Sequence, residues 1–403
     1  MSGEIETTVT GRGAAGRVAL ALAVAAPALV VRLAGVELAP VAAVLVFGAA
    51  VLASVALLMW ASEAARVDIS GSLALAILAL VAILPEYAVD IYFAYTAGHR
   101  PEYAAYATAN MTGANRLLIG VAWPLLVGFA IYAVRRRQKR GDRNAVQLAP
   151  HRRTEIIFLA MATVYALVIP LTGRLAWYDS IVLGGLFALY LWRIRGNEEG
   201  EEELTGVAAT VAVQPAGRRR GLVAALFVGA GIIILAAAEP FADALVGAGS
   251  SLGIDEFLLV QWLAPIASEA PEVIVAITFA LKGRADDGMG ALLAAKLNQW
   301  TLLIATLPLA YYVGGGEFAG LPLDARQTEE LVLTTAQTLL GVAVLVDLRL
   351  TRGEAILLFA LFAVQFVVPS PNIRYIIAAA YTVLAVALLV KQRRQLPALI
   401  KAL

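Results

Sequence analysis

Long apolar segments, separated by short polar loops, run through almost the whole chain. A helix needs about 20 residues to cross a hydrocarbon core of about 30 Å. We expect 12 helices near that length, at 18–36, 40–62, 70–97, 103–134, 155–173, 178–194, 221–247, 253–281, 289–313, 327–347, 354–369 and 373–390. The pattern predicts an all-α polytopic membrane protein with about 12 transmembrane helices. We expect the first segment to be retained rather than removed as a signal peptide.

Two of these apolar segments contain a proline followed by a glutamate. Pro85 precedes Glu86 in the third segment, and Pro271 precedes Glu272 in the eighth. A charge at the centre of a membrane helix costs about 2.5–3.5 kcal/mol on insertion scales. A proline in a helix interior also removes a backbone hydrogen bond. We therefore expect both helices to be interrupted at the proline, and both carboxylates to have a function.

The surroundings of the two Pro-Glu pairs repeat. Asn115 follows Pro85 by 30 residues, and Asn298 follows Pro271 by 27. If every segment spans the membrane, segments two to six and seven to eleven form two inverted five-helix repeats. Inverted repeats with interrupted helices are typical of secondary transporters. Packing kinks are the alternative, but they explain neither the adjacent glutamates nor the opposite orientations.

A charged linker divides the chain into two membrane halves. Residues 1–195 form the N-terminal half, with the first repeat motif at 83–124. Residues 221–403 form the C-terminal half, with the second motif at 264–308. We expect the linker, 196–220, to be a solvated cytoplasmic connector, with a regulatory ion or lipid site as the alternative.

Basic residues are unequally distributed between the loops. If the run Arg135–Arg140 is cytoplasmic, the loops on its side and both termini hold 24 of the 31 Lys and Arg residues, and the opposite loops hold five. Because cytoplasmic loops carry the excess of positive charge, we expect both termini to be cytoplasmic. The chain is then a multi-pass protein of the plasma (inner) membrane.

The composition agrees with this interpretation and limits which kinds of functional site the chain can form. Of the 403 residues, 61% are hydrophobic and 15% are charged. The chain has no cysteine and two histidines, so thiolate metal sites are excluded and a histidine-based centre is not expected. We recognise no enzyme or nucleotide motif, and we expect no enzyme activity, no cofactor and no nucleic-acid partner. The expected partners are the lipid bilayer and transported cations.

Further charged residues lie beside the Pro-Glu pairs. Asp90 is four residues after Glu86, and Glu269 is three before Glu272, so each pair shares a helix face. Charged groups inside a membrane face one another or water. Arg116 does not lose its proton in proteins, and we expect it to be a permanent partner of Asp90 or Glu86.

Lys296 lies two residues before Asn298, and its role admits two interpretations. It forms a fixed ion pair with Glu269 or Glu272 and so occupies a former cation position. Alternatively, it titrates and releases a proton when a cation enters, because the pKa of a buried lysine falls readily. The sequence leaves both open.

A second acidic pair, Glu239 and Asp243, flanks Pro240 in the segment 221–247. The two residues are four apart and share a helix face. They line an ion pathway or cap a helix that Pro240 breaks, and both alternatives stay open.

The segments 84–86 (Leu-Pro-Glu) and 270–272 (Ala-Pro-Glu), each followed by a helix with an asparagine, resemble the two alpha repeats of the calcium/cation antiporter superfamily, which includes the sodium/calcium exchanger family. Residues 109–115, Ala-Asn-Met-Thr-Gly-Ala-Asn, look like that family's Gly-Asn-x-x-Gly-Ser-Asn segment. The chain is identified on these residues as a divergent member.

The resemblance implies Ca²⁺ transport against Na⁺ or H⁺ by alternating access, with Glu86 and Glu272 as the central metal ligands. Together with the acids that share their helix faces, the candidate cation-binding residues are Glu86, Glu272, Asn115, Asn298, Ser268, Glu269 and Asp90, with Lys296 and Arg116 as charge partners.

Calcium takes six to eight oxygen ligands, and residues 82–84 and 296–298 lack hydroxyls that the family has. These losses favour the alternative of a monovalent cation/proton antiporter in which Lys296 replaces a bound cation. An enzyme and a passive channel are weaker alternatives.

Overall fold

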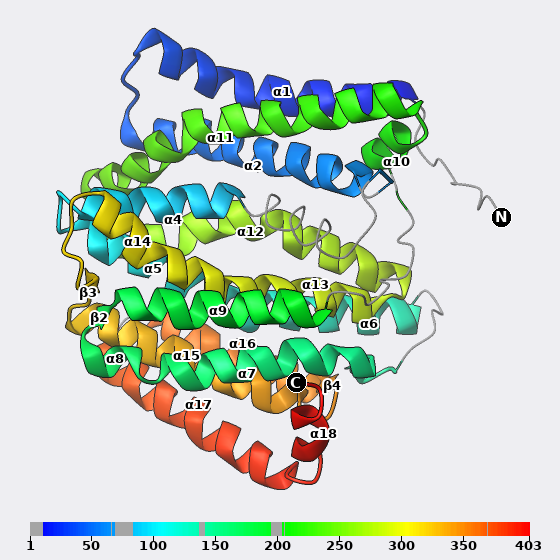
Figure 1. Cartoon of the computed structure of the whole chain (residues 1–403), viewed down its shortest axis with the longest axis vertical. Coiled ribbons are helices and arrows are strands. Elements are labelled where there is room, and N and C mark those ends of the chain that lie inside the picture. Colours follow the sequence, from blue (N-terminus) through cyan, green and yellow to red (C-terminus); the bar gives the residue numbers. More distant parts are fainter. Residues whose placement is uncertain are drawn as a thin grey trace. The chain divides into compact units, whose positions relative to one another are not determined.

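A computed structural model describes residues 11–65, 67–68, 84–136, 142–194, 204, 206–368 and 370–403 (Figure 1). The acidic run of the linker, the first part of the segment 70–97 and the second part of the basic run 135–140 lie outside the described residues. A helix lies in each of the predicted ranges. The chain divides into two compact units, Met1–Tyr92 with Ile194–Pro271, and Phe93–Arg193 with Glu272–Leu403. Each unit takes residues from both predicted membrane halves.

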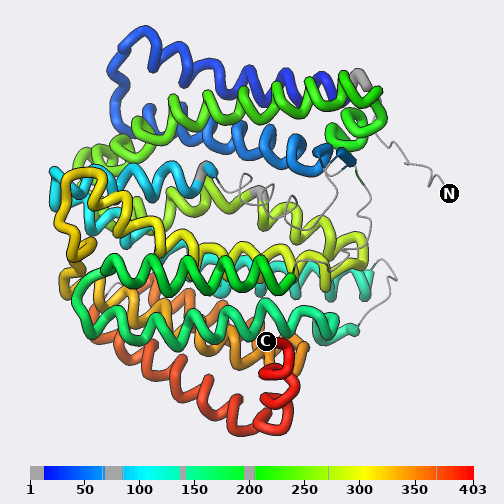
Figure 2. Tube along the Cα trace, in the orientation of Figure 1, coloured from blue at the N-terminus to red at the C-terminus, as the bar shows by residue number. Residues whose placement is uncertain are grey.

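The first unit is built on three long helices. Helix α2 (Pro40–Ala65) packs against α1 (Gly11–Ala34) and along α11 (Ala216–Leu252), and Figure 2 shows their paths side by side. At Gly48 the approach is close, because an added Cβ would lie 3.0 Å from the ring of Phe241. The short helix α10 (Gly206–Ala212) packs on α2, and the first parts of α4 (Leu84–Ala97) and α12 (Glu256–Lys282) complete the unit.

The second unit contains two long helices that each change their winding in the middle. Helices α5 and α6 are joined by the π-helical turn η1, and helices α13 and α14 by the π-helical turn η3. Their bounds are α5 (Tyr103–Leu117), η1 (Leu118–Ala122), α6 (Trp123–Arg136), α13 (Ala285–Asn298), η3 (Gln299–Leu303) and α14 (Ile304–Val313). Around them lie η2 (Pro150–Arg152), α7 (Arg153–Ala166), α8 (Ile169–Thr172), α9 (Trp177–Ile194), α15 (Ala325–Leu345), α16 (Arg352–Val367), α17 (Pro371–Lys391) and α18 (Leu396–Ile400).

Two short antiparallel ribbons tie loops of the second unit together. Strand β1 (Ala145–Gln147) pairs with β4 (Arg349–Thr351), with Val146 opposite Leu350. Strand β2 (Arg174–Leu175) pairs with β3 (Leu321–Pro322). The first ribbon joins the loop after α6 to the start of α16, so the ends of these two helices are held side by side.

Membrane-spanning character is confirmed by length and composition. Among the described residues, seven helices are long and apolar enough to cross a membrane, or eight when the two arms of bent α12 count as one span. The prediction of a helical polytopic membrane protein is therefore confirmed. The count of 12 spans and the inverted repeats stay predictions.

Of the two helices with a Pro-Glu pair, α12 is bent at its proline, where the interruption was expected. Helix α12 remains helical from Glu256 to Lys282 and bends by 50° between Glu256–Ala270 and Glu272–Lys282. The proline therefore bends this helix without ending it. In α4, Pro85 is the second described residue and the residues directly before Leu84 lie outside the described part of the chain, so the interruption expected there stays a prediction.

Candidate functional site

The first unit buries two carboxyl side chains on helix α4. Glu86 lies in the first turn and is 4% exposed, and Asp90, one turn later, is fully buried. Their spacing places both on one helix face, as predicted. Burial of two acids on one face is costly in a membrane helix, which supports a functional role for the pair.

Helix α12 contributes a second buried polar face to the first unit. Ser268 and Glu269 are 8% and 5% exposed. The Ser268 hydroxyl donates to the carbonyl oxygens of Ala264 and Pro265, both at 3.3 Å. Gln261, two turns earlier and also buried, was missed by sequence reasoning. Neither polar atom of its amide has a hydrogen-bond partner among the described residues.

Glu239 and Asp243 of α11 have partners within the first unit. Arg32 donates to Glu239 in an ion pair, and the Tyr92 hydroxyl donates to Asp243 Oδ2 at 2.8 Å. Helix α11 continues through Pro240, so the expectation that these acids cap a broken helix is wrong. A proline kink leaves most of the helical hydrogen bonds intact.

In the second unit, Lys296 of α13 contacts Asn115 of α5. The lysine Nζ donates to Asn115 Oδ1 at 2.6 Å and approaches the Asn115 carbonyl oxygen at 3.3 Å. It also lies 4.4 Å from the ring centre of Trp300, a distance suited to a cation–π interaction. Both Lys296 and Asn115 are fully buried. An amide oxygen predicted to bind a cation thus contacts a positive charge that the chain itself supplies.

Both asparagines of the predicted repeats stand beside a π-helical turn. Asn115 lies three residues before η1, and Asn298 directly precedes η3. Asn298 and its neighbour Gln299 are 4% and 2% exposed. Single π-helical turns inside α-helices are rare and occur frequently at functional sites. Sequence reasoning missed them because no residue type specifies the extra residue in the turn.

Arg116 belongs to a buried charge cluster in the second unit. Its guanidinium lies 2.5 Å from Glu330 Oε2 and donates to Gln365 Oε1 at 2.7 Å. Gln337 donates to the Arg116 carbonyl oxygen at 3.2 Å. The predicted pairing of Arg116 with Asp90 or Glu86 involves residues of the other unit and stays a prediction.

Arg374 extends this cluster to helix α17. It lies 2.9 Å from Glu330 and 3.3 Å from Glu329, and all three side chains are buried. Arg374 lies in the first turn of α17, near the start of the predicted segment 373–390, and is 4% exposed. The pairing compensates two arginines with two glutamates, which is how buried charges are tolerated.

Glu272 falls in the second unit, on the arm of α12 after the bend. Its side chain is partly exposed, and Oε2 is buried with no hydrogen-bond partner among the described residues. The predicted pairing of Lys296 with Glu269 or Glu272 stays a prediction. Within the part of the chain that the structure describes, no three His, Asp or Glu side chains gather into a metal site.

Comparison with known proteins agrees with these features. The family model described as "Sodium/calcium exchanger protein" matches residues 39–195 and 222–370. A solved structure of the H⁺/Ca²⁺ exchanger CAX is 40% identical, with a TM-score of 0.89, over 96% of this chain and 97% of that one.

Two further matches are more distant. The structure of native YfkE is 16% identical with a TM-score of 0.62, over 91% of this chain and 99% of that one, and shows likeness of fold alone. A putative antiporter CaxA from Alkalimonas amylolytica is 31% identical over 150 residues, which are 36% of this chain. The matched stretch covers 45% of that relative, less than half its length.

Proposed function

Since the chain belongs to the sodium/calcium exchanger protein family, we propose that it is a secondary antiporter that exchanges Ca²⁺ against H⁺ or Na⁺ by alternating access. The observation that carries the proposal is the 40% identity to the H⁺/Ca²⁺ exchanger CAX over 96% of the chain. The family is one of transporters, and we propose no enzymatic reaction and no cofactor; the cations are substrates.

Glu86 and Glu272 are the central Ca²⁺ ligands in this proposal. Burial of Glu86 and the buried Oε2 of Glu272 support it, because a carboxylate away from water is best compensated by a cation. Calcium prefers several oxygen ligands. The further oxygens come from Asp90, Glu269, Ser268, Asn115 and Asn298.

The transport architecture follows the sequence repeat. We assign 12 spans, two inverted five-helix repeats with their motifs at 83–124 and 264–308, and a cytoplasmic linker at 196–220. The π-helical turns η1 and η3, at corresponding places in the two motifs, support the repeat. Both termini face the cytoplasm and the protein is in the plasma membrane, on the evidence of the basic residues in the loops.

A second candidate is supported by the contact between Lys296 and Asn115. The Lys296 ammonium is hydrogen-bonded to the Asn115 amide oxygen, which a bound cation would otherwise contact. The chain then exchanges a monovalent cation against protons on the same scaffold, with Lys296 in place of one bound cation. A buried, hydrogen-bonded positive charge lowers the affinity of neighbouring oxygens for a divalent ion by repulsion.

Counterflow in proteoliposomes tests the proposed antiport. Vesicles are loaded with unlabelled Ca²⁺ and diluted into a trace of radiolabelled Ca²⁺. With the membrane potential held at zero by potassium and valinomycin, an antiporter accumulates label transiently above its equilibrium level, whereas a channel only equilibrates it. The same assay with labelled Na⁺ identifies the monovalent alternative. Transient accumulation of neither label would contradict both candidates.

A further inference from the structure

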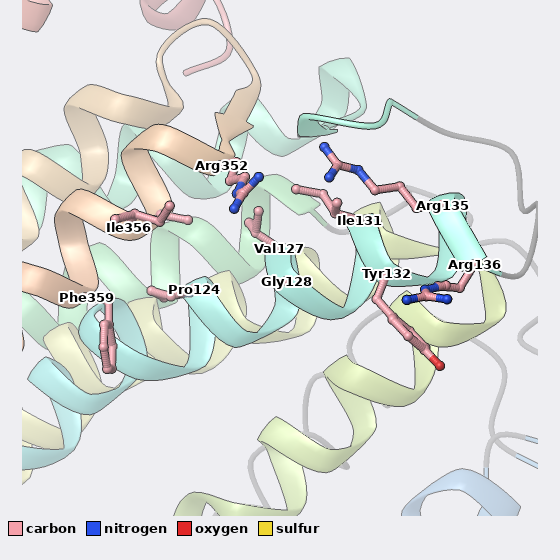
Figure 3. Close-up of a pocket in the computed structure, with 11 residues that line it drawn as sticks. Pro124, Val127, Gly128, Ile131, Tyr132, Arg135, Arg136, Arg352, Ile356 and Phe359 are labelled. Atoms are coloured by element: carbon pink, nitrogen blue, oxygen red, sulfur yellow. The ribbon is translucent and has the colours of Figure 1, made fainter.

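A groove in the second unit runs between helices α6 and α16. It encloses about 480 Å³ (Figure 3). Most of its wall is apolar and lies on Pro124, Val127, Gly128, Ile131, Ala355, Ile356 and Phe359. Ile356 and Phe359 are half exposed, and Val127 and Ala355 form the buried floor. The groove therefore has an apolar lining, part of which is exposed at the surface of the unit.

Positive charge gathers at one end of the groove. Arg135 and Arg136 lie in the last turn of α6, and Arg352 is the first residue of α16. In Figure 3 Arg135 and Arg136 lie toward one end and Phe359 toward the other, with Arg352 between them above Val127. The ribbon of β1 and β4 ties these helix ends together, and Arg135, Arg136 and Arg352 all line the groove.

These arginines have no acidic partner in the described part of the chain. The nearby acids are engaged elsewhere: Asp142 pairs with Arg349 at 2.8 Å, and Glu354 accepts from the backbone and hydroxyl of its helix cap. Arg135 donates to loop oxygens at 2.9 Å. Neither Arg136 nor Arg352 forms a side-chain hydrogen bond or ion pair among the described residues. The opening is complementary to an anion.

The length of the groove matches one leaflet of a bilayer. Pro124 and Arg135 are 11 residues apart on α6, about 16 Å at 1.5 Å per residue. Half of a hydrocarbon core of about 30 Å is about 15 Å. A ligand with a phosphate at the basic end and a hydrocarbon tail along the apolar wall would extend from the headgroup level toward the bilayer centre.

We propose that the groove binds one molecule of an anionic phospholipid, with its headgroup among Arg135, Arg136 and Arg352 and one acyl chain over Gly128 toward Phe359. Guanidinium groups suit phosphate because their planar donors match its oxygens. A second copy of the chain would bring three more arginines to the same end, so charge favours the lipid. The assignment does not depend on which cations the protein exchanges.

Two pairs of matched variants test the site. A Cβ added at Gly128 meets no heavy atom within 4 Å, so Gly128→Leu fills the groove without disturbing the helix. Gly185→Leu is its control, because Gly185 of α9 is also exposed and open. The double variant Arg136→Gln/Arg352→Gln removes charge at the groove. Arg393→Gln/Arg394→Gln removes the same charge at exposed residues elsewhere.

The measurement is native mass spectrometry of the purified full-length protein titrated with phosphatidylglycerol or phosphatidylcholine. We expect wild type and both controls to retain one phosphatidylglycerol, and Gly128→Leu to lose it. Each arginine near an anionic headgroup changes affinity about fivefold, so the double variant binds about 25-fold more weakly. Equal phosphatidylglycerol affinity in a groove variant and its control would overturn the proposal. Equal retention of phosphatidylcholine by wild type would overturn it too.

Discussion

The ammonium of Lys296 donates a hydrogen bond of 2.6 Å to the side-chain oxygen of Asn115. This bond joins α13 to α5, the helices that follow the two Pro-Glu pairs, and it lies close to both π-helical turns. Asn115 also donates to the Met111 carbonyl oxygen at 2.8 Å, which fixes its amide. The ammonium of Lys296 is therefore bonded to Asn115 Oδ1, the atom with which Asn115 would bind a cation.

Replacing Lys296 with methionine should change the charge moved in each transport cycle. Lys296→Met frees Asn115 Oδ1 and removes one positive charge from a buried site, so one further monovalent cation is needed to balance the same carboxylates. The measurement is the potential at which Ca²⁺ flux reverses in proteoliposomes, set with potassium and valinomycin. Lys282→Met removes an exposed lysine and serves as the control. A variant that lowers yield but keeps the wild-type reversal potential would assign Lys296 a structural role only.

Removing Arg116 should destabilise the fold strongly. Arg116→Met leaves Glu330 and Gln365 without their shared partner in a buried cluster. Breaking one side of a buried ion pair costs about 3–5 kcal/mol, visible as a lowered midpoint of thermal unfolding in detergent.

A second substitution separates lost pairing from lost packing. Glu330→Gln, added to Arg116→Met, removes the uncompensated charge, so the double variant should recover part of the stability. The exposed pair Arg100 and Glu102 provides the control, and Arg100→Met should change the midpoint little. Strictly additive losses in the double variant would argue against a coupled cluster.

The ion pair between Asp68 and Arg219 should make stability sensitive to strong acid. Hydrogen bonds from Arg219 lower the pKa of Asp68 from 3.8 to about 2. A carboxyl group with a lowered pKa stabilises the fold above its unfolded-state pKa, and this stability is lost as the pH falls through the folded-state pKa. The stabilisation should therefore be complete at neutral pH and disappear between about pH 4 and about pH 2.

Thermal unfolding of wild type and Asp68→Asn across this pH range measures the effect. The difference in midpoint should be constant above about pH 5 and shrink toward zero near pH 2. Glu317→Gln, at an exposed residue with no ion pair among the described residues, should show no such difference. A midpoint difference that persists undiminished at pH 2 would contradict the assignment.

Helix positions could be predicted because the length and apolarity of a membrane span are local properties. The segment 40–62 was expected and α2 spans Pro40–Ala65. The sequence predicted an interruption at Pro271. The structure shows a bend there, and α12 is helical on both sides of the proline. The sequence pattern sets where a helix lies, while neighbouring helices decide how far it bends.

Partners across the fold could not be predicted in the same way. Arg116 and Glu330 are 214 residues apart, and the sequence offers several buried acids without ranking them. One signal was available: Glu330, Thr334 and Gln337 recur on one face of α15 inside an apolar segment. The contact between Lys296 and Asn115 likewise depends on how two distant helices pack.

The most direct test of the proposed function is uptake of radiolabelled Ca²⁺ into proteoliposomes under an imposed proton or sodium gradient. We expect wild type to accumulate Ca²⁺ while the gradient lasts. Glu272→Gln should not accumulate it, because a neutral amide cannot balance a divalent ion. Glu317→Gln should transport like wild type. Full uptake by Glu272→Gln, or no gradient-driven uptake by wild type, would contradict the account.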